Sequence, residues 1–359
     1  MKVLVAGDSF IKSDIMRNYL EKSLSKLDPF LEIHTIEWST LYYQKNVLQG
    51  VRRIIKEFSG SPRELAKVMD GVEILVVHTA PVTAEVLDAS KKLRIIACAR
   101  GGPVNVDIDA ATDRNIPVIN TPGRNADAVA DYTLGLILAE TRNIARAFED
   151  LRKGCWKYEY YDYEICGYEL ADKILGLIGF GHVGRKVAQR AKGFGMKVLV
   201  YDPYVEETDI LAEGCQPVDL ETLLRESDFV SIHARLTPST VKMIGAKELS
   251  LMKRTAYLIN TARGELVDLK ALCEALEKKS IAGAALDVFE TEPLDKNSPI
   301  LKYNNVTITP HIAGAAKDVV ARTAKMITDD IERLLMGKTP LHCVNPSVLS
   351  KWKSPLLVE

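Results

Sequence analysis

The sequence has few of the features that mark membrane, secreted or nucleic-acid-binding proteins. No apolar run approaches the roughly 18 residues that a membrane helix needs, and the first residues lack the apolar core of a signal peptide. The formal net charge of the 359-residue chain is only −1, so we expect no basic surface for nucleic acid or an anionic membrane. Internal repeats and low-complexity segments are also missing.

Cysteine pairs at metal-binding or redox spacing are missing as well. The six cysteines are scattered, without any C-x-x-C pair, at Cys98, Cys155, Cys166, Cys215, Cys273 and Cys343. This spacing predicts reduced thiols in a cytoplasmic protein, with no disulfide framework and no metal site. The hydrophobic fraction of 47% and charged fraction of 26% are ordinary for a soluble globular enzyme, and the length allows two domains.

The clearest motif is a glycine-rich turn halfway along the chain. An apolar run at 174–178 leads into Gly179-Phe180-Gly181-His182-Val183-Gly184, and helical spacing follows. Gly179 would allow the sharp turn, Gly181 would let the backbone approach a pyrophosphate, and Gly184 would let the helix pack on the strand. The helix N-terminus would offer free N–H groups to the phosphates. The alternative is a glycine turn in an ordinary strand–helix unit.

An acidic residue at the expected distance supports the nucleotide-binding interpretation. Asp202 ends the next apolar run, 197–201, and follows Gly179 by 23 residues. The dinucleotide fingerprint places an acid about 20 residues on, where it hydrogen-bonds the adenosine ribose. Asp202 would repel a 2′-phosphate, and the next three residues include no Arg or Lys. We therefore predict NAD as the cofactor rather than NADP.

Apolar runs and helical patterns alternate on both sides of this motif. The fold class is therefore predicted to be α/β, with two parallel sheets in two Rossmann-like or flavodoxin-like domains. Residues 51–58 are predicted to be helical, and residues 124 to about 151 to form one long helix that is apolar around most of its circumference between 126 and 139. Such a helix is buried, often in a subunit interface. The aromatic-rich segment 152–168 is interpreted as a surface loop or an interface arm.

Three further segments carry a family resemblance. They are Leu-Ile-Asn-Thr-Ala-Arg-Gly at 258–264, Ala-Leu-Asp-Val-Phe-Glu-Thr-Glu-Pro at 285–293, and Thr-Pro-His at 309–311. With the glycine turn, they closely resemble the D-isomer-specific 2-hydroxyacid dehydrogenases, which include phosphoglycerate and D-lactate dehydrogenases. The resemblance implies a homodimer with the NAD-binding domain, 123–311, inserted into a substrate domain made of 1–122 and 312–359. The active cleft would lie between the domains.

The resemblance also implies a catalytic set of Arg263, Glu292 and His311. Arg263 has a planar guanidinium that can hold a carboxylate and polarise the adjacent carbonyl. His311 is the natural acid/base, because an ordinary imidazole titrates near working pH. Glu292 would orient the imidazole, with Glu290 as a nearby rival. The alternatives are a surface arginine at 263 and a turn acid at 292.

Other family roles fall on residues that flank these segments. The cofactor would contact His182 and Val183 in the glycine turn, then Ala234, Thr261 and Asp287 at later strand ends. We expect only backbone contacts from His182. Asp287 matches the residue that binds the nicotinamide carboxamide, and its alternative role is to cap a turn at a strand end.

The substrate loop would be Arg100-Gly101-Gly102, whose backbone N–H groups would bind the substrate carboxylate. The sequence departs from the family pattern here, because Arg100 stands in the place of a glycine. Arg235 is a second departure, at a position where the family commonly has proline. One hypothesis is that Arg100 points into the cleft and contacts a second anionic or polyhydroxy group of the substrate, such as a phosphate. The alternative is that Arg100 packs outward against Asp107 or solvent.

Together these features predict an NAD-dependent oxidoreductase that interconverts a D-2-hydroxyacid and a 2-keto acid by hydride transfer. A formate-type dehydrogenase would not need the Glu292–His311 pair, because carbon dioxide leaves without protonation of an oxygen. A non-catalytic NAD-sensing corepressor on the same scaffold would tolerate loss of the Arg–Glu–His set, and this chain keeps all three residues.

Overall fold

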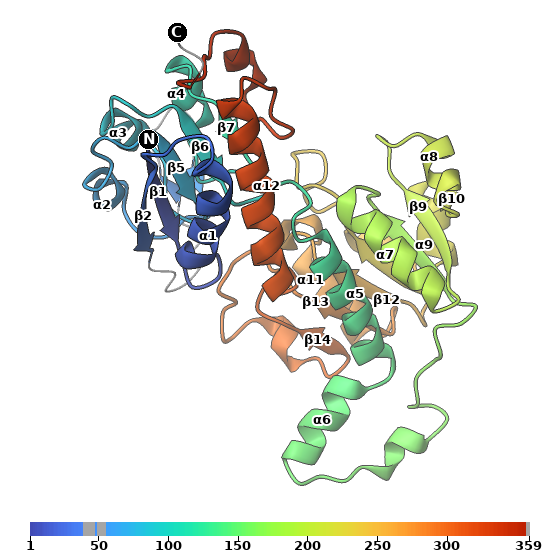
Figure 1. The fold of residues 1–359 in the computed structure, drawn as a ribbon. Coiled ribbons are helices and arrows are strands. Elements are labelled where there is room, and N and C mark those ends of the chain that lie inside the picture. Colours follow the sequence, from blue (N-terminus) through green and yellow to red (C-terminus); the bar gives the residue numbers. More distant parts are fainter. Residues whose placement is uncertain (39–46, 49–54, 357–359) are drawn as a thin grey trace. The chain divides into compact units, whose positions relative to one another are not determined.

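The computed structural model describes residues 1–38, 47–48 and 55–356, and the chain divides into two units (Figure 1). Unit 1 consists of Met1–Arg124 and Ala315–Glu359, and unit 2 consists of Asn125–Gly314. The sequence predicts domain boundaries after residues 122 and 311. In the described residues, no helix is both long and apolar enough to cross a membrane.

Unit 1 is built on a five-stranded parallel sheet in the order β2-β1-β5-β6-β7. The strands are β1 (Lys2–Gly7), β2 (Glu32–Glu37), β5 (Ile74–Val77), β6 (Ile95–Cys98) and β7 (Val118–Ile119). Every residue of β5 and β6 is buried, as expected for central strands of a parallel sheet that is covered on both faces.

Two groups of helices cover the two faces of this sheet. The helices of unit 1 are α1 (Ser13–Leu24), α2 (Pro62–Ala66), α3 (Ala84–Asp88), α4 (Ile108–Asp113), α12 (Lys317–Leu335) and the 3-10 helix η4 (Pro346–Ser350). Val3 and Val5 of β1 pack with α1 and α12, whereas Leu4 and Ala6 face the cluster that contains α2, α3 and α4. The alternation follows from the two-residue period of a strand.

One local prediction in unit 1 is wrong. Ile55–Lys56 is a strand, β4, which pairs antiparallel with β3 (Val47–Leu48), whereas the sequence predicted a helix over 51–58. The rest of that prediction, at 51–54, lies outside the described residues.

Unit 2 contains a seven-stranded parallel sheet in the order β10-β9-β8-β11-β12-β13-β14. Its strands are β8 (Ile174–Ile178), β9 (Lys197–Tyr201), β10 (Gln216–Pro217), β11 (Phe229–Ile232), β12 (Tyr257–Asn260), β13 (Gly283–Leu286) and β14 (Val306–Ile308). The chain leaves β8 towards β9 on one side, and later returns to place β11 on the other side of β8. This change of direction is the topological switch point at which such sheets bind ligands.

The helices of unit 2 cover this sheet and form one projection from it. They are α5 (Ala126–Thr141), α6 (Ile144–Arg152), η1 (Tyr158–Tyr161), α7 (His182–Gly193), α8 (Glu207–Ala212), α9 (Leu220–Glu226), α10 (Ala246–Leu251), η2 (Gly264–Leu266), α11 (Leu269–Glu277) and η3 (Pro299–Lys302). Within unit 2, α6 and η1 extend away from the sheet (Figure 1). The prediction of a single helix over 124–151 is wrong, because the structure has two helices there, α5 and α6. Asn143, between them, adopts a left-handed conformation with φ 57°, which ends the regular helix.

Candidate active site

A histidine and a glutamate meet beyond the carboxyl ends of β13 and β14. Nδ1–H of His311 donates to Oε2 of Glu292 across 2.8 Å, and Oε1 of Glu292 accepts from the backbone N–H of Phe289 at 2.9 Å. The carboxylate is therefore held at both oxygens, and it fixes the orientation of the ring. Because Nδ1 faces Glu292, the other ring nitrogen of His311 is the one that can exchange a proton with a substrate.

The loop that carries His311 is held in an uncommon backbone conformation. His311 has φ 57°, and its N–H donates to the carbonyl of Asp287 at 2.8 Å. The buried Asp287 carboxylate accepts three hydrogen bonds from the same loop, from Oγ1 of Thr309 (2.6 Å) and the N–H groups of Ile312 (2.9 Å) and Ala313 (2.8 Å). A positive φ in a residue other than glycine persists only where the surroundings impose it. These bonds provide that constraint.

Arg263 lies in a turn that follows β12. Asn260, the buried last residue of β12, donates from Nδ2 to the carbonyl of Arg263 (2.9 Å) and accepts the N–H of Ala262 at its Oδ1 (3.0 Å). The exposed Arg263 side chain donates to the carbonyl of Ala262 at 2.7 Å, and within the described ranges no carboxylate pairs with it. Its guanidinium is therefore available to a ligand carboxylate.

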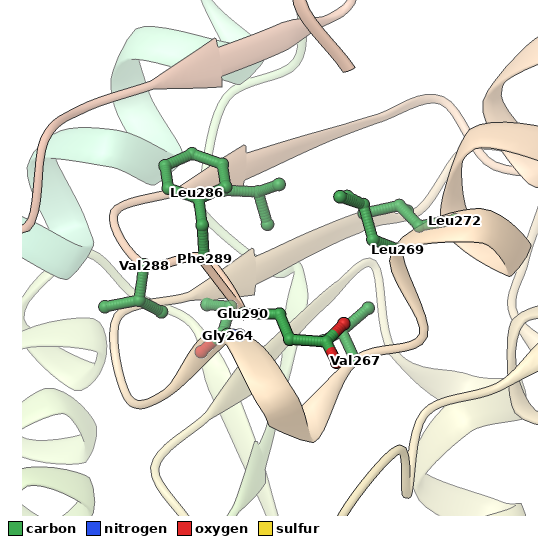
Figure 2. A pocket seen from close by; sticks show the side chains of 9 residues that line it. Gly264, Val267, Leu269, Leu272, Leu286, Val288, Phe289 and Glu290 are labelled. Carbon is green, nitrogen blue, oxygen red and sulfur yellow. The ribbon is translucent and has the colours of Figure 1, made fainter. Parts of the chain in front are cut away.

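The Arg263 turn and the segment leading to Glu292 are in direct backbone contact at Gly264 (Figure 2). A Cβ atom built on Gly264 would lie 2.0 Å from the carbonyl carbon of Phe289 and 2.3 Å from the nitrogen of Glu290. Apolar side chains, including those of Val267, Leu269, Leu272, Leu286, Val288 and Phe289, line a pocket of about 10 Å³ beside this contact. This volume holds about one water molecule, so the pocket is too small for a substrate.

The glycine turn after β8 has the geometry that a dinucleotide requires. Gly179 has φ 99°, and a Cβ on Gly184 would lie 2.3 Å from the carbonyl oxygen of Gly179, so helix α7 approaches the strand closely. A Cβ on Gly181 would meet no atom within 4 Å, which leaves open space in front of the turn. His182 and Val183 begin α7, whose first N–H groups have no partner inside the helix. The turn therefore fits a pyrophosphate.

The acidic residue after β9 supports the same turn. Asp202 accepts the N–H of Phe180 at Oδ2 (2.7 Å) and the N–H of Tyr204 at Oδ1 (2.9 Å). A carboxylate oxygen has more than one acceptor site, so Asp202 can still accept a ribose hydroxyl. On the other side of the turn, a Cβ on Gly179 would lie 2.7 Å from the nitrogen of Ala234.

Burial lowers the pKa of the neighbouring His233 to about 3, so this imidazole is neutral at physiological pH.

In unit 1, three buried polar side chains form a hydrogen-bonded row beyond the carboxyl ends of β1 and β5. Nδ1–H of His78 donates to Oδ2 of Asp8 at 2.6 Å, and a guanidinium nitrogen of Arg124 donates to Nε2 of His78 at 3.2 Å. Because a guanidinium can only donate, Nε2 must accept and the imidazole is neutral. Burial lowers the pKa of His78 to about 4, which agrees with that assignment.

The predicted substrate loop follows β6 in the same unit. Arg100 is buried, and its guanidinium donates to the carbonyl of Glu57 at 2.6 Å and to the Glu57 carboxylate at 2.5 Å. Gly101 and Gly102 are exposed, and a Cβ on Gly102 would meet no atom within 4 Å. The two glycines therefore present open backbone, while the Arg100 side chain is inside the unit and not directed to solvent.

Comparison with known proteins identifies the family. The sequence profile of the D-isomer specific 2-hydroxyacid dehydrogenase NAD binding domain matches residues 134–313. A glyoxylate reductase of Korarchaeum cryptofilum is 39% identical over 335 residues, which are 93% of this chain and 96% of that protein. The chain belongs to the D-isomer specific 2-hydroxyacid dehydrogenases.

Two further relatives of this dehydrogenase extend the comparison. A D-3-phosphoglycerate dehydrogenase of Methanocaldococcus jannaschii is 38% identical over 83% of this chain, which covers 56% of that longer protein. The solved structure of a D-isomer specific 2-hydroxyacid dehydrogenase from Lactobacillus delbrueckii, in its NAD complexed form, aligns with a TM-score of 0.75 at 25% identity, over 96% of this chain and 100% of that one.

The activity class follows from membership of the family. The dehydrogenase is an NAD-dependent oxidoreductase that interconverts 2-hydroxyacids and 2-keto acids by hydride transfer. The relatives support this activity over the two alternatives, a formate-type dehydrogenase and an NAD-sensing corepressor. NAD supplies or accepts the hydride when it is bound, and the protein binds, orients and protonates the substrate.

The structure brings some of the predicted site residues together in unit 2. Glu292 hydrogen-bonds His311. Thr261 is hydrogen-bonded through its hydroxyl to Thr133 of α5 at 3.0 Å. Asp287 binds the loop around His311, and its role towards the nicotinamide carboxamide stays a prediction.

Two residues that position the site were not singled out in the sequence. Asn260 shapes the Arg263 turn, and Thr309 donates to Asp287. The only feature of the sequence that could have indicated them is their position at strand ends, inside the motifs at 258–264 and 309–311. That position indicates a neighbour of the site without indicating which side chain is bonded to which backbone group.

Proposed function

We propose that this dehydrogenase reduces a small 2-keto acid such as glyoxylate to the corresponding 2-hydroxyacid. The observation that carries the proposal is the His311–Glu292 pair. Hydrogen bonds to Asp287 fix the loop of His311, and the segment leading to Glu292 touches the Arg263 turn. The small-acid assignment is supported by the glyoxylate reductase that is 39% identical over 93% of this chain.

Each residue of the set has a defined task in the proposed reaction. Arg263 holds the carboxylate of the keto acid in a charge-assisted hydrogen-bonded pair and polarises the adjacent carbonyl. His311, protonated at both ring nitrogens, gives the proton on Nε2 to the carbonyl oxygen as hydride reaches the carbonyl carbon. Glu292 stabilises the imidazolium and holds its orientation. In the oxidation direction the same ring nitrogen of His311 accepts the hydroxyl proton.

The substrate domain of this proposal is unit 1, with Gly101 and Gly102 as its carboxylate-binding backbone. The open space around Gly102 supports this assignment, since a substrate carboxylate could approach the N–H groups of the loop. The roles of Gly179, Gly181, Gly184 and Asp202 in binding NAD are part of the same proposal, and their local geometry supports it.

A second candidate substrate is a phosphorylated or polyhydroxy 2-keto acid. Two buried arginines, Arg100 and Arg124, follow β6 and β7 at the carboxyl edge of the unit 1 sheet, where ligands of such sheets bind. The ion pair of Arg100 with Glu57 offsets one of these charges. We therefore rank the phosphorylated acid second.

A matched substrate panel separates the two candidates. NADH oxidation is measured with glyoxylate, hydroxypyruvate and 3-phosphohydroxypyruvate, of which the last two differ only by a phosphate. We expect the highest kcat/KM with an unphosphorylated acid. The contrary result, a preference for the phosphorylated acid of about tenfold or more that Arg100→Ala abolishes, would assign the second candidate. The ratio of the kcat/KM values for the two substrates does not depend on how much of the variant enzyme is folded, because a loss of folded enzyme lowers both values equally.

We also propose a homodimer that forms through α6 and the following segment. No residue of α6 is buried in unit 2, and Ile144, Phe148 and Leu151 form an apolar stripe at helical spacing. A second copy of the chain would bury this stripe. Phe148→Glu should convert the dimer to a monomer in light scattering, whereas Phe30→Glu, at another exposed phenylalanine, should leave it intact. A wild-type chain that is monomeric at micromolar concentration would refute the proposal.

A cytoplasmic location is the last part of the proposal. All six cysteines are free thiols, and Cys98, Cys215 and Cys273 are buried. Reduced thiols are typical of proteins in reducing compartments. Titration of the protein, unfolded without reductant after isolation from its native source, should count six thiols, and a lower count restored by reductant would contradict this location.

A further inference from the structure

Arg235 follows β11, directly beside the glycine turn of unit 2. Strand β11 pairs with β8, and the N–H of His233 donates to the carbonyl of Ile178 at 2.7 Å. A Cβ on Gly179 would lie 2.7 Å from the nitrogen of Ala234, so the two loops touch at the switch point of the sheet. Arg235 is the next residue after this contact.

The backbone at Arg235 is fixed by its own loop. Oγ1 of Thr240 donates to the carbonyl of Arg235 at 2.8 Å and accepts the N–H of Thr237 at 2.8 Å. Such a hydroxyl-closed turn holds the Cα of Arg235 in place beside the glycine turn. The exposed side chain therefore begins from a defined position at the crevice in which the dinucleotide is expected.

The charge balance around the turn indicates a role for this guanidinium. Arg185 on α7 is already paired with Asp209 (3.8 Å) and Glu213 (3.3 Å), and its guanidinium packs over the Phe180 ring. Arg235 has neither an ion pair nor a side-chain hydrogen bond with any residue that the structure describes. A pyrophosphate in the turn would bring two negative charges close to the carboxylate of Asp202, and a nearby cation would offset this repulsion.

We propose that Arg235 binds the pyrophosphate of the dinucleotide and sets the affinity of the enzyme for NAD(H). Its guanidinium forms charge-assisted hydrogen bonds with the phosphate oxygens from the side of the turn opposite Asp202. It does not touch the reacting atoms, so it acts on cofactor affinity and leaves the hydride step unchanged.

Binding measurements on the full-length enzyme test this role directly. The Kd of NADH is measured by fluorescence for the wild type, Arg235→Ala and Arg235→Lys, and the Kd of ADP-ribose and of adenosine by competition. Arg254→Ala is the matched control, because Arg254 is also an exposed arginine but precedes β12, at the opposite edge of the sheet. Each titration is repeated at about 20 and about 200 mM salt, where screening differs strongly.

We expect Arg235→Ala to raise the Kd of NADH and ADP-ribose by about tenfold at low salt, and less at high salt. Arg235→Lys should recover part of the affinity, adenosine binding should not change, and kcat at saturating NADH should stay within about twofold of the wild type. An unchanged Kd for ADP-ribose would overturn the proposal. So would an equal effect of Arg254→Ala, or a loss that is equally large for adenosine.

Discussion

Replacing Gly264 by alanine tests whether the backbone contact beside the active site positions the catalytic groups. The new Cβ would lie 2.0 Å from the carbonyl carbon of Phe289, whereas ordinary contact begins at 3.4 Å. The three nearest atoms belong to the backbone of Phe289 and Glu290, so no side chain can rotate out of the way. The Arg263 turn and the segment leading to Glu292 must therefore separate by roughly 1 Å or more.

The size of this displacement sets the expected effect. A misplacement of about 1 Å can lower a catalytic rate by about 100-fold, and overpacking costs about 1–3 kcal/mol of stability. We expect kcat of Gly264→Ala to fall about 100-fold, with a loss of about 1–3 kcal/mol in the free energy of unfolding. The Kd of NADH should change much less than kcat, because the glycine turn at 179–184 is a separate segment.

Steady-state kinetics, NADH fluorescence titration and urea unfolding measure these three quantities. Gly193→Ala is the matched control, since a Cβ at Gly193 would meet no atom within 4 Å and alanine favours a helix. A Gly264→Ala enzyme with kcat within twofold of the wild type would refute the reasoning. It would mean that the two segments can move apart without disturbing Arg263, Glu292 and His311.

Three further predictions concern the acid/base, the cofactor and pH. His311→Ala should lower kcat by about 10²–10⁴-fold with little change in the Kd of NADH, and a smaller loss would assign proton transfer to another group. Asp202→Ala should weaken NADH binding and reduce discrimination against NADPH, and an unchanged ratio of the two Kd values would contradict its ribose role. Burial lowers the pKa of His78 to about 4 in the folded protein, from an ordinary 6.5, so on acidification the unfolded chain takes up a proton at His78 before the folded protein does. The free energy of unfolding should therefore fall by up to about 3 kcal/mol as the pH drops from about 6.5 to about 4. Urea unfolding at several pH values should show a flatter dependence for His78→Gln, and an equal dependence would locate the acid sensitivity elsewhere.

Most of the fold could be predicted from the sequence because its strands are apolar runs bounded by turns. The predicted runs at 174–178 and 197–201 coincide with β8 and β9. The break between α5 and α6 was missed because Arg142 and Asn143 carry no glycine or proline signal, and only the left-handed φ of Asn143 reveals it. The strand at Ile55–Lys56 was missed because such a short strand depends on its partner, β3.

In the candidate site too, the residues inside a sequence motif could be predicted, whereas contacts between residues far apart in the sequence could not. The types and order of Arg263, Glu292 and His311 were enough to name them as a set, and the structure joins the last two. The Glu57 partner of Arg100 was not predicted, because a pair 43 residues apart leaves no local pattern. The approach of Gly264 to Phe289 was hidden for the same reason.

The late return of the chain to unit 1 has a consequence for synthesis on the ribosome. Val320, Ala324, Ile327 and Ile331 of α12 pack with Val3 and Val5 of the first strand, more than 300 residues earlier in the sequence. During translation, the whole of unit 2 is synthesised before α12. The unit that begins first is thus completed last, and one face of its sheet is covered by α1 alone, without α12, until the intervening polypeptide has been made.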